Sequence, residues 1–210
     1  MARLPRNKEI IGFAVGSDSD LDMVDEAEGI FEDFGVKAEW AIKSAHRTPD
    51  EMFEWASTAE DRGLEAIIGA AGGSAHLAPM MASKTVLPVI AVGVDRKNNA
   101  NNSAVASQIE MPPGVPLLFT GLNQSGAKNA ALAAIRIAGS KYPVLRERMR
   151  DYKQNLGNEV RDKNDKLHKI GLGAYRAEQI RAKLAKSISA EVDHMELIQA
   201  EQDRRLGIER

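Results

Sequence analysis

The stretch Ile10-Ile11-Gly12-Phe13-Ala14-Val15-Gly16-Ser17-Asp18-Ser19-Asp20 starts as a continuous apolar run and ends in a glycine followed by hydroxyl and carboxyl side chains. A short apolar run of this kind is typical of a buried strand. Behind it, apolar residues recur at spacings of three and four, which predicts an amphipathic helix that stops at Gly35. These residues are Met23, Ala27, Ile30, Phe31 and Phe34. The chain therefore opens with a strand, a polar loop and a helix.

The same alternation continues through the first 140 residues. Further strands are predicted over residues 36–42, 66–70, 89–92 and 117–120. One helix is predicted to begin at Thr48-Pro49-Asp50-Glu51, where Thr48 and Glu51 have the spacing of a capping box, and another spans residues 125–137. Strand–helix alternation implies right-handed crossovers. We therefore predict an α/β fold, a three-layer sandwich with a central parallel sheet of flavodoxin-like or Rossmann-like type.

Composition excludes several classes of protein. The 210 residues include 28 basic and 30 acidic side chains, and a formal charge of −2 argues against a nucleic-acid-coating protein. The absence of Cys excludes disulfides and thiolate chemistry, and four His without Cys make a dedicated metal site unexpected. The first apolar run is too short for a secretory signal or a membrane span, so we expect a cytoplasmic protein without membrane contact.

The chain changes character near residue 150. In residues 151–210, 23 of 60 side chains are charged, against 35 of 150 before them. We predict a domain over residues 1–150 and a charged helical C-terminal extension over residues 151–210, interrupted near Gly171 and Gly173. The extension carries an amphipathic stripe that must be covered, either by its own subunit or by a neighbouring one. The stripe consists of Ile180, Leu184, Ile188, Val192, Met195 and Ile198.

Three polar loops follow predicted strands, and in parallel sheets ligands bind beyond the carboxyl ends of the strands. In the first loop, Gly16 and the hydroxyls of Ser17 and Ser19 suit an anion at a helix N-terminus, although ordinary N-capping explains the same residues. Two acidic residues beside a phosphate are unfavourable, so Asp18 or Asp20 is a candidate ligand of sugar hydroxyls.

The second loop, Ser44-Ala45-His46-Arg47-Thr48-Pro49, combines an imidazole with a fixed cation. Arg47 can clamp a phosphate through two parallel N–H bonds, and His46 can take and return a proton. The alternative is a surface loop with two polar residues.

The third loop is Ala71-Gly72-Gly73-Ser74-Ala75-His76-Leu77. Its glycines allow a flat ligand to approach the backbone, and His76 lies where the next helix is predicted to begin. The loop does not match the dinucleotide fingerprint, and a tight turn with a capping serine is the alternative. Together the three loops indicate a small phosphorylated ligand and proton transfer, with no metal and no organic cofactor.

These three loops, and the stretch Gln108-Ile109-Glu110-Met111-Pro112-Pro113-Gly114-Val115-Pro116, closely resemble the PurE family over residues 10–149. The resemblance implies a three-layer α/β fold, a homo-oligomer that is commonly an octamer, and a ribonucleotide substrate in de novo purine biosynthesis. One class of the family converts N5-carboxyaminoimidazole ribonucleotide into 4-carboxy-5-aminoimidazole ribonucleotide; the other adds carbon dioxide directly to aminoimidazole ribonucleotide.

Arg47 and Gly73 resemble the mutase class, because direct carboxylases typically carry Lys and Arg at these positions. The resemblance implies that His46 is the general acid and base and that Ser17, Asp20 and Arg47 bind substrate. We also predict binding roles for Ser19, Ser44, Gly72, Gly73, Ser74 and His76. Direct carboxylation and a non-catalytic nucleotide-binding paralogue remain alternatives.

The sequence departs from the family pattern in three places, one of which is the 60-residue extension over residues 151–210, longer than is usual in the family. The Asp of the Asp-Ser pair that commonly precedes the fourth motif is missing from residues 103–107 of the altered loop 95–107, in which the Asn-rich residues 98–102 are expected to form a mobile loop. In the third loop, Ala78-Pro79 stands where a Pro-Gly pair is common.

Overall fold

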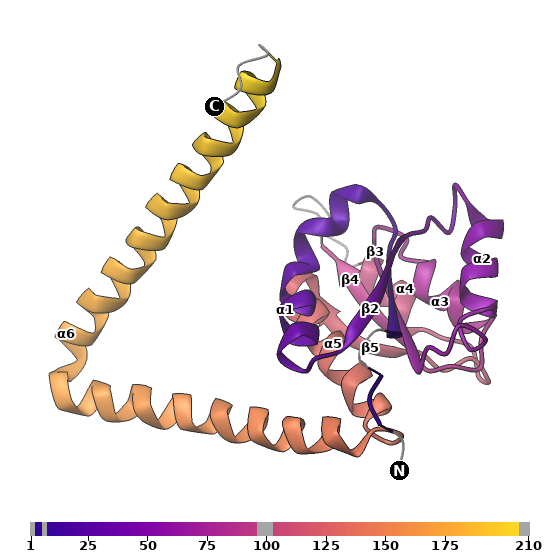
Figure 1. Cartoon of the computed structure of the whole chain (residues 1–210), viewed down its shortest axis with the longest axis horizontal. Coiled ribbons are helices and arrows are strands. Elements are labelled where there is room, and N and C mark those ends of the chain that lie inside the picture. The colour runs from indigo at the N-terminus through magenta and orange to yellow at the C-terminus, as the bar shows by residue number, and fades with distance from the viewer. Residues whose placement is uncertain (1–2, 6–7, 96–102, 206–210) are drawn as a thin grey trace. The chain divides into compact units, whose positions relative to one another are not determined.

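The computed structural model describes residues 3–5, 8–95 and 103–205, and its five strands form one parallel sheet (Figure 1). The order β2-β1-β3-β4-β5 is the flavodoxin-like order, which confirms the predicted fold class. The strands are β1 (Glu9–Val15), β2 (Lys37–Ile42), β3 (Ala66–Gly72), β4 (Val89–Val94) and β5 (Leu118–Leu122). The predicted loop at residues 98–102 lies outside the described residues.

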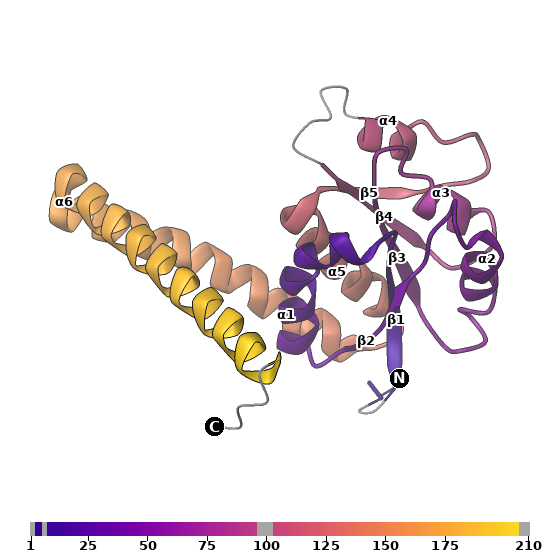
Figure 2. The ribbon, with the colours of Figure 1, turned by 90° about the horizontal axis from the view of Figure 1, so that it is seen from above.

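Helices cover both faces of the sheet. Figure 2 shows α1 and α5 on one face and α2, α3 and α4 on the other. The predicted first helix is divided into a 3₁₀ helix, η1, and α1. The helices are η1 (Asp18–Met23), α1 (Asp25–Asp33), α2 (Pro49–Ser57), α3 (Leu77–Ala82), α4 (Ser103–Ile109), α5 (Asn123–Ala138) and α6 (Pro143–Arg205).

The chain divides into two compact units, residues 1–151 and 152–210. The core of the first unit lies on the central strands, where Phe13, Ile68 and Ile90 are fully buried. Within the described residues, the second unit is the remainder of α6 up to Arg205, which is helical except at Gly171, where φ is 77° and ψ is 161°. The predicted break is therefore found at Gly171, whereas Gly173 is helical. No helix in the described part of the chain is long and apolar enough to cross a membrane.

Gly126 sets how closely α5 packs behind β5. A Cβ added there would lie 2.6 Å from the carbonyl carbon and oxygen of Gly121, so the backbone would have to move. We expect Gly126→Ala to lower the free energy of unfolding by about 1–3 kcal/mol, as overpacking does.

The matched control is Gly29→Ala in α1, where no described atom lies within 4 Å of the added Cβ. Because alanine is the better helix former, this change should raise stability by up to about 1 kcal/mol. Urea unfolding of both variants measures the difference, and equal stability would contradict the close approach at Gly126.

Candidate active site

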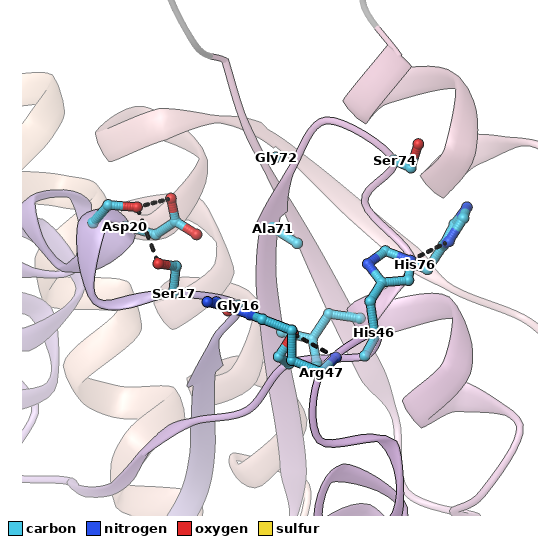
Figure 3. A pocket seen from close by; sticks show the side chains of 13 residues that line it. Gly16, Ser17, Asp20, His46, Arg47, Ala71, Gly72, Ser74 and His76 are labelled. Atoms are coloured by element: carbon cyan, nitrogen blue, oxygen red, sulfur yellow. Dashed lines mark hydrogen bonds between the residues drawn. The ribbon is translucent and has the colours of Figure 1, made fainter.

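The loops that follow β1, β2 and β3 meet at the carboxyl edge of the sheet, where strand order reverses around β1. They enclose a cavity of about 400 Å³ (Figure 3). This volume lies within the range of small-molecule sites. The lining residues are Gly16, Ser17, Ser19, Asp20, Ser44, Ala45, His46, Arg47, Ala71, Gly72, Ser74, His76 and Leu77.

Every predicted site residue except Gly73 lines this cavity. Gly73 has a φ of 65°, so it forms the turn that carries the third loop away from β3. Ala45, Ala71 and Leu77 were not predicted as site residues, and they are buried. They add apolar wall to the cavity, and their only signal in the sequence is their position inside the polar motifs.

The first loop differs from the predicted anion cradle. The Ser19 N–H and the Ser17 hydroxyl both donate to the Asp18 carboxylate, each at 2.9 Å. These bonds hold the pKa of the Asp18 carboxyl below its usual value. At this helix N-terminus the Ser19 N–H is thus bound within the loop and not free for an anion, and Asp18 is not among the residues that line this cavity.

Asp20 lies on the cavity side of η1 and is only 4% exposed. Its carboxylate lies 3.4 Å from the Ser19 hydroxyl, which also lies 3.2 Å from the Ser17 hydroxyl and has one proton to donate to either (Figure 3). A carboxylate can accept further hydrogen bonds from hydroxyl groups. Of the two acidic residues in this loop, Asp20 is therefore the one that lines the cavity.

Ser44 organises the second loop. Its hydroxyl accepts the Arg47 backbone N–H at 3.1 Å, and its carbonyl accepts the Thr48 N–H at 3.0 Å. The predicted capping box is wrong, because the Thr48 side chain makes no cap bond to α2. Its hydroxyl instead accepts the Ser44 N–H at 3.2 Å, which closes the loop, while Glu51 lies 3.7 Å from Lys43.

Arg47 connects the first two loops. One terminal N–H of its guanidinium donates to the Gly16 carbonyl at 3.3 Å, and its Nε donates to the Ser44 hydroxyl at 3.4 Å. The side chain is exposed on the cavity wall, so donors remain for a ligand. A guanidinium fixed in this way suits a phosphate or carboxylate group.

His46 and His76 connect the second and third loops. The Nε2 atom of His46 lies 2.9 Å from Nδ1 of His76, which is hydrogen-bond distance, and the tautomers of the two rings decide which of them donates. The other nitrogen of the His46 ring lies on the side facing Ala71 (Figure 3). The ring that was predicted to transfer protons therefore has one nitrogen held by protein and one directed to the cavity.

Helix α4 supports the third loop. The Ser107 hydroxyl accepts the Ala75 N–H at 3.1 Å and donates to the Ser103 carbonyl at 2.8 Å. Ala75 precedes His76, so Ser107 helps to fix the start of α3. Ser107 was not predicted as a site residue, because nothing in the local sequence pattern shows that α4 lies against this loop.

Similar proteins were found by both sequence and structure. Residues 10–159 match the family described as AIR carboxylase. The chain is 44% identical over 171 residues to the N5-carboxyaminoimidazole ribonucleotide mutase of Pyrococcus horikoshii, covering 81% of this chain and 96% of that protein. It is 45% identical over 165 residues to the enzyme of the same name from Thermotoga maritima, covering 79% and 95%.

The crystal structure of Treponema denticola PurE has the same fold. It aligns with a TM-score of 0.66 over 76% of this chain and 99% of that chain, at 22% sequence identity. The predicted resemblance is thus confirmed by a family match and by relatives aligned over most of their length. This chain belongs to the AIR carboxylase (PurE) family.

Proposed function

We propose that the protein is an isomerase of de novo purine biosynthesis that converts N5-carboxyaminoimidazole ribonucleotide into 4-carboxy-5-aminoimidazole ribonucleotide. The observation that carries this proposal is the meeting of His46 and Arg47 with both glycine-containing loops around one cavity. The mutase relatives support the reaction, since they align over nearly their whole length.

The reaction requires one proton to be given and one to be taken. Cleavage of the bond between the exocyclic nitrogen and the carboxylate carbon releases carbon dioxide, and His46 supplies the proton that the nitrogen gains. The ring carbon then bonds to carbon dioxide, and the proton that this carbon loses returns to His46. One imidazole can perform both steps, and each placed transfer contributes about 10²–10⁴ in rate.

The remaining lining residues divide by chemistry. Arg47 binds the phosphate, and Asp20 with Ser17 and Ser19 binds ribose hydroxyls. Gly72, Ser74 and His76 form the wall against which carbon dioxide is retained between the two steps, which is a matter of proximity and exclusion of water. Ser44 and Gly73 contribute indirectly, through the loops that they shape.

His76 acts on catalysis through His46. Because its Nδ1 lies 2.9 Å from His46 Nε2, His76→Leu should lower kcat about tenfold or more through loss of proper ring orientation, with a smaller change in KM. His76→Asn keeps a polar group near Nδ1 and should recover part of the loss. Steady-state kinetics of both variants test this role, and equal kcat in the Leu and Asn variants would contradict it.

A turnover assay distinguishes the mutase from the direct carboxylase. The purified protein is given N5-carboxyaminoimidazole ribonucleotide alone, or aminoimidazole ribonucleotide with bicarbonate. We expect turnover of the first substrate at a rate that bicarbonate does not change. Turnover of the second mixture at a comparable or higher rate would instead assign direct carboxylation.

The non-catalytic alternative predicts ligand binding without product. Titration calorimetry with the same ribonucleotides, run beside the turnover assay, identifies that outcome. The proposal further includes a cytoplasmic homo-octamer, supported by the family resemblance. Light scattering of the purified full chain measures the assembly.

A further inference from the structure

The end of α6 presents an exposed apolar face. We call residues 172–205, which follow the break at Gly171, the distal segment; Figure 1 shows it as one continuous helix after the bend in α6. Six of its apolar side chains form a stripe in which each residue is at least 41% exposed. At 1.5 Å per residue this stripe is about 27 Å long, or about five turns. Its members are Ile180, Leu184, Ile188, Val192, Met195 and Ile198.

Charge divides residues 174–203 of the distal segment, which are followed by Arg204 and Arg205, into two halves of opposite sign. Residues 174–188 contain four basic residues and one acidic residue, whereas residues 189–203 contain five acidic residues and no Lys or Arg. The boundary between the halves falls at Ile188, next to the midpoint of the stripe. The basic residues are Arg176, Arg181, Lys183 and Lys186, and the acidic ones of the second half are Glu191, Asp193, Glu196, Glu201 and Asp203.

We propose that the apolar stripe binds the same stripe of a second copy of this chain, with the two helices antiparallel and centred between Ile188 and Ser189. Each basic half then lies beside the acidic half of the other copy. A parallel pair would place the two basic halves together and the two acidic halves together, and flanking charges of this kind set orientation in paired helices.

The register centred between Ile188 and Ser189 also matches individual charged positions. Position 176, an Arg, then lies at the level of position 201, a Glu, and position 181, an Arg, at the level of position 196, a Glu. In the same register Ile180 lies within one residue of the level of Ile198, so the two ends of the stripe come together. Apolar pairing and charge pairing thus select one register.

Residues 153–170, which precede the distal segment, are a poorer partner for the stripe than a second distal segment. Residues 153–170 contain five basic and three acidic residues, and the two signs are interspersed along the helix. They cannot match a partner whose charge reverses once at its middle. Its apolar residues Leu156 and Val160 are themselves exposed.

Single cysteines provide the test, because the chain has none of its own. In the antiparallel pair, Ile188→Cys lies within one residue of its own counterpart, about 1.5 Å along the helix axis, and should form a disulfide-linked dimer under mild oxidation. Position 180 lies about 25 Å from its counterpart along the helix axis, far beyond the ~7 Å limit on Cα separation for a disulfide.

We therefore expect at least about tenfold more self-cross-linking of Ile188→Cys than of Ile180→Cys, because of that limit. A mixture of full-length Ile180→Cys and Ile198→Cys chains should form the mixed dimer. Equal self-cross-linking at positions 180 and 188 would indicate a parallel pair and overturn the proposal, as would the absence of any cross-link at position 188.

Charge reversal tests the orientation independently, in the Ile188→Cys background. Changing Arg176, Arg181 and Lys183 to Glu makes both halves acidic and should lower the yield of cross-linked dimer several-fold. Adding Glu191→Lys, Glu196→Lys and Glu201→Lys restores opposite halves and should restore the yield. In a parallel pair the first change only replaces one like-charge contact by another, so an unchanged yield would contradict the antiparallel arrangement.

The apolar contact has its own matched pair of variants. Leu184→Glu introduces a charge into the stripe and should abolish the cross-link at position 188. Ala182→Glu adds the same charge outside the stripe and should leave the yield within about twofold, as expected of an exposed substitution. Equal loss in both variants would show that the stripe is not the contact surface.

Discussion

His46→Asn should yield a folded protein that binds its ribonucleotide and turns it over more slowly by at least about 10²-fold, the lower value for loss of one placed acid–base group. Asparagine is close to imidazole in size and polarity, and it cannot carry a proton between two atoms of the substrate. The expected signature is a fall in kcat with a dissociation constant changed by only a few-fold.

The matched control for this variant is His168→Asn in α6. His168 is exposed, its Nδ1 lies 2.9 Å from the Asn164 carbonyl oxygen, and it does not line the cavity. The same chemical change there should leave turnover unaltered. Near-normal turnover of His46→Asn would remove His46 as the acid and base, whereas a complete loss of ligand binding would assign it to recognition instead.

Arg47→Ala should act mainly on binding. A hydrogen bond to a charged group contributes about 1.5–3 kcal/mol, so loss of the guanidinium should raise KM about 10- to 100-fold. Arg47→Lys keeps the charge without the planar fork, and only part of the affinity should return. Calorimetry with the ribonucleotide and with its dephosphorylated nucleoside separates the phosphate contribution: only the nucleotide should lose affinity.

Lys43→Ala is the control for the Arg47 variants, because it removes one positive charge from the segment that follows β2, in which Arg47 also lies. Lys43 pairs with Glu51 at 3.7 Å and does not line the cavity. We expect little change in KM. If Arg47→Ala weakens the nucleoside as much as the nucleotide, Arg47 shapes the first two loops through Gly16 and Ser44 and does not hold the phosphate.

The fold could be predicted because each strand and helix carries its own pattern. The apolar run that ends at Val15 is buried along β1, and the run that begins at Ala66 is buried in β3, where both faces of the strand meet helices. Strand ends were less certain. β3 continues two residues beyond its predicted end because Ala71 and Gly72 pair with Gly93 and Val94, and such pairing is not visible in a local pattern.

The sequence predicted which residues form the site better than it predicted the hydrogen bonds between them. Residue types with useful chemistry stood at the ends of three parallel strands, and the geometry of such sheets brings those ends together. The partners of individual side chains followed from loop conformation instead. The Thr48 hydroxyl accepts a hydrogen bond within its own loop and does not cap α2. The Asp18 carboxylate accepts the Ser19 N–H, so this donor at the helix N-terminus is not free for an anion.

The sequence alone determined the parallel α/β architecture, the position of three polar loops at one edge and the apolar stripe near the C-terminus, because each follows from periodicity along the chain. Only the tertiary structure decided that His46 lies within hydrogen-bond distance of His76, that Arg47 reaches Gly16, and that Ser107 in α4 holds the third loop. These contacts join residues about 30 positions apart. The distances between these residues depend on how separate loops pack against each other, and a local sequence pattern carries no information about that packing.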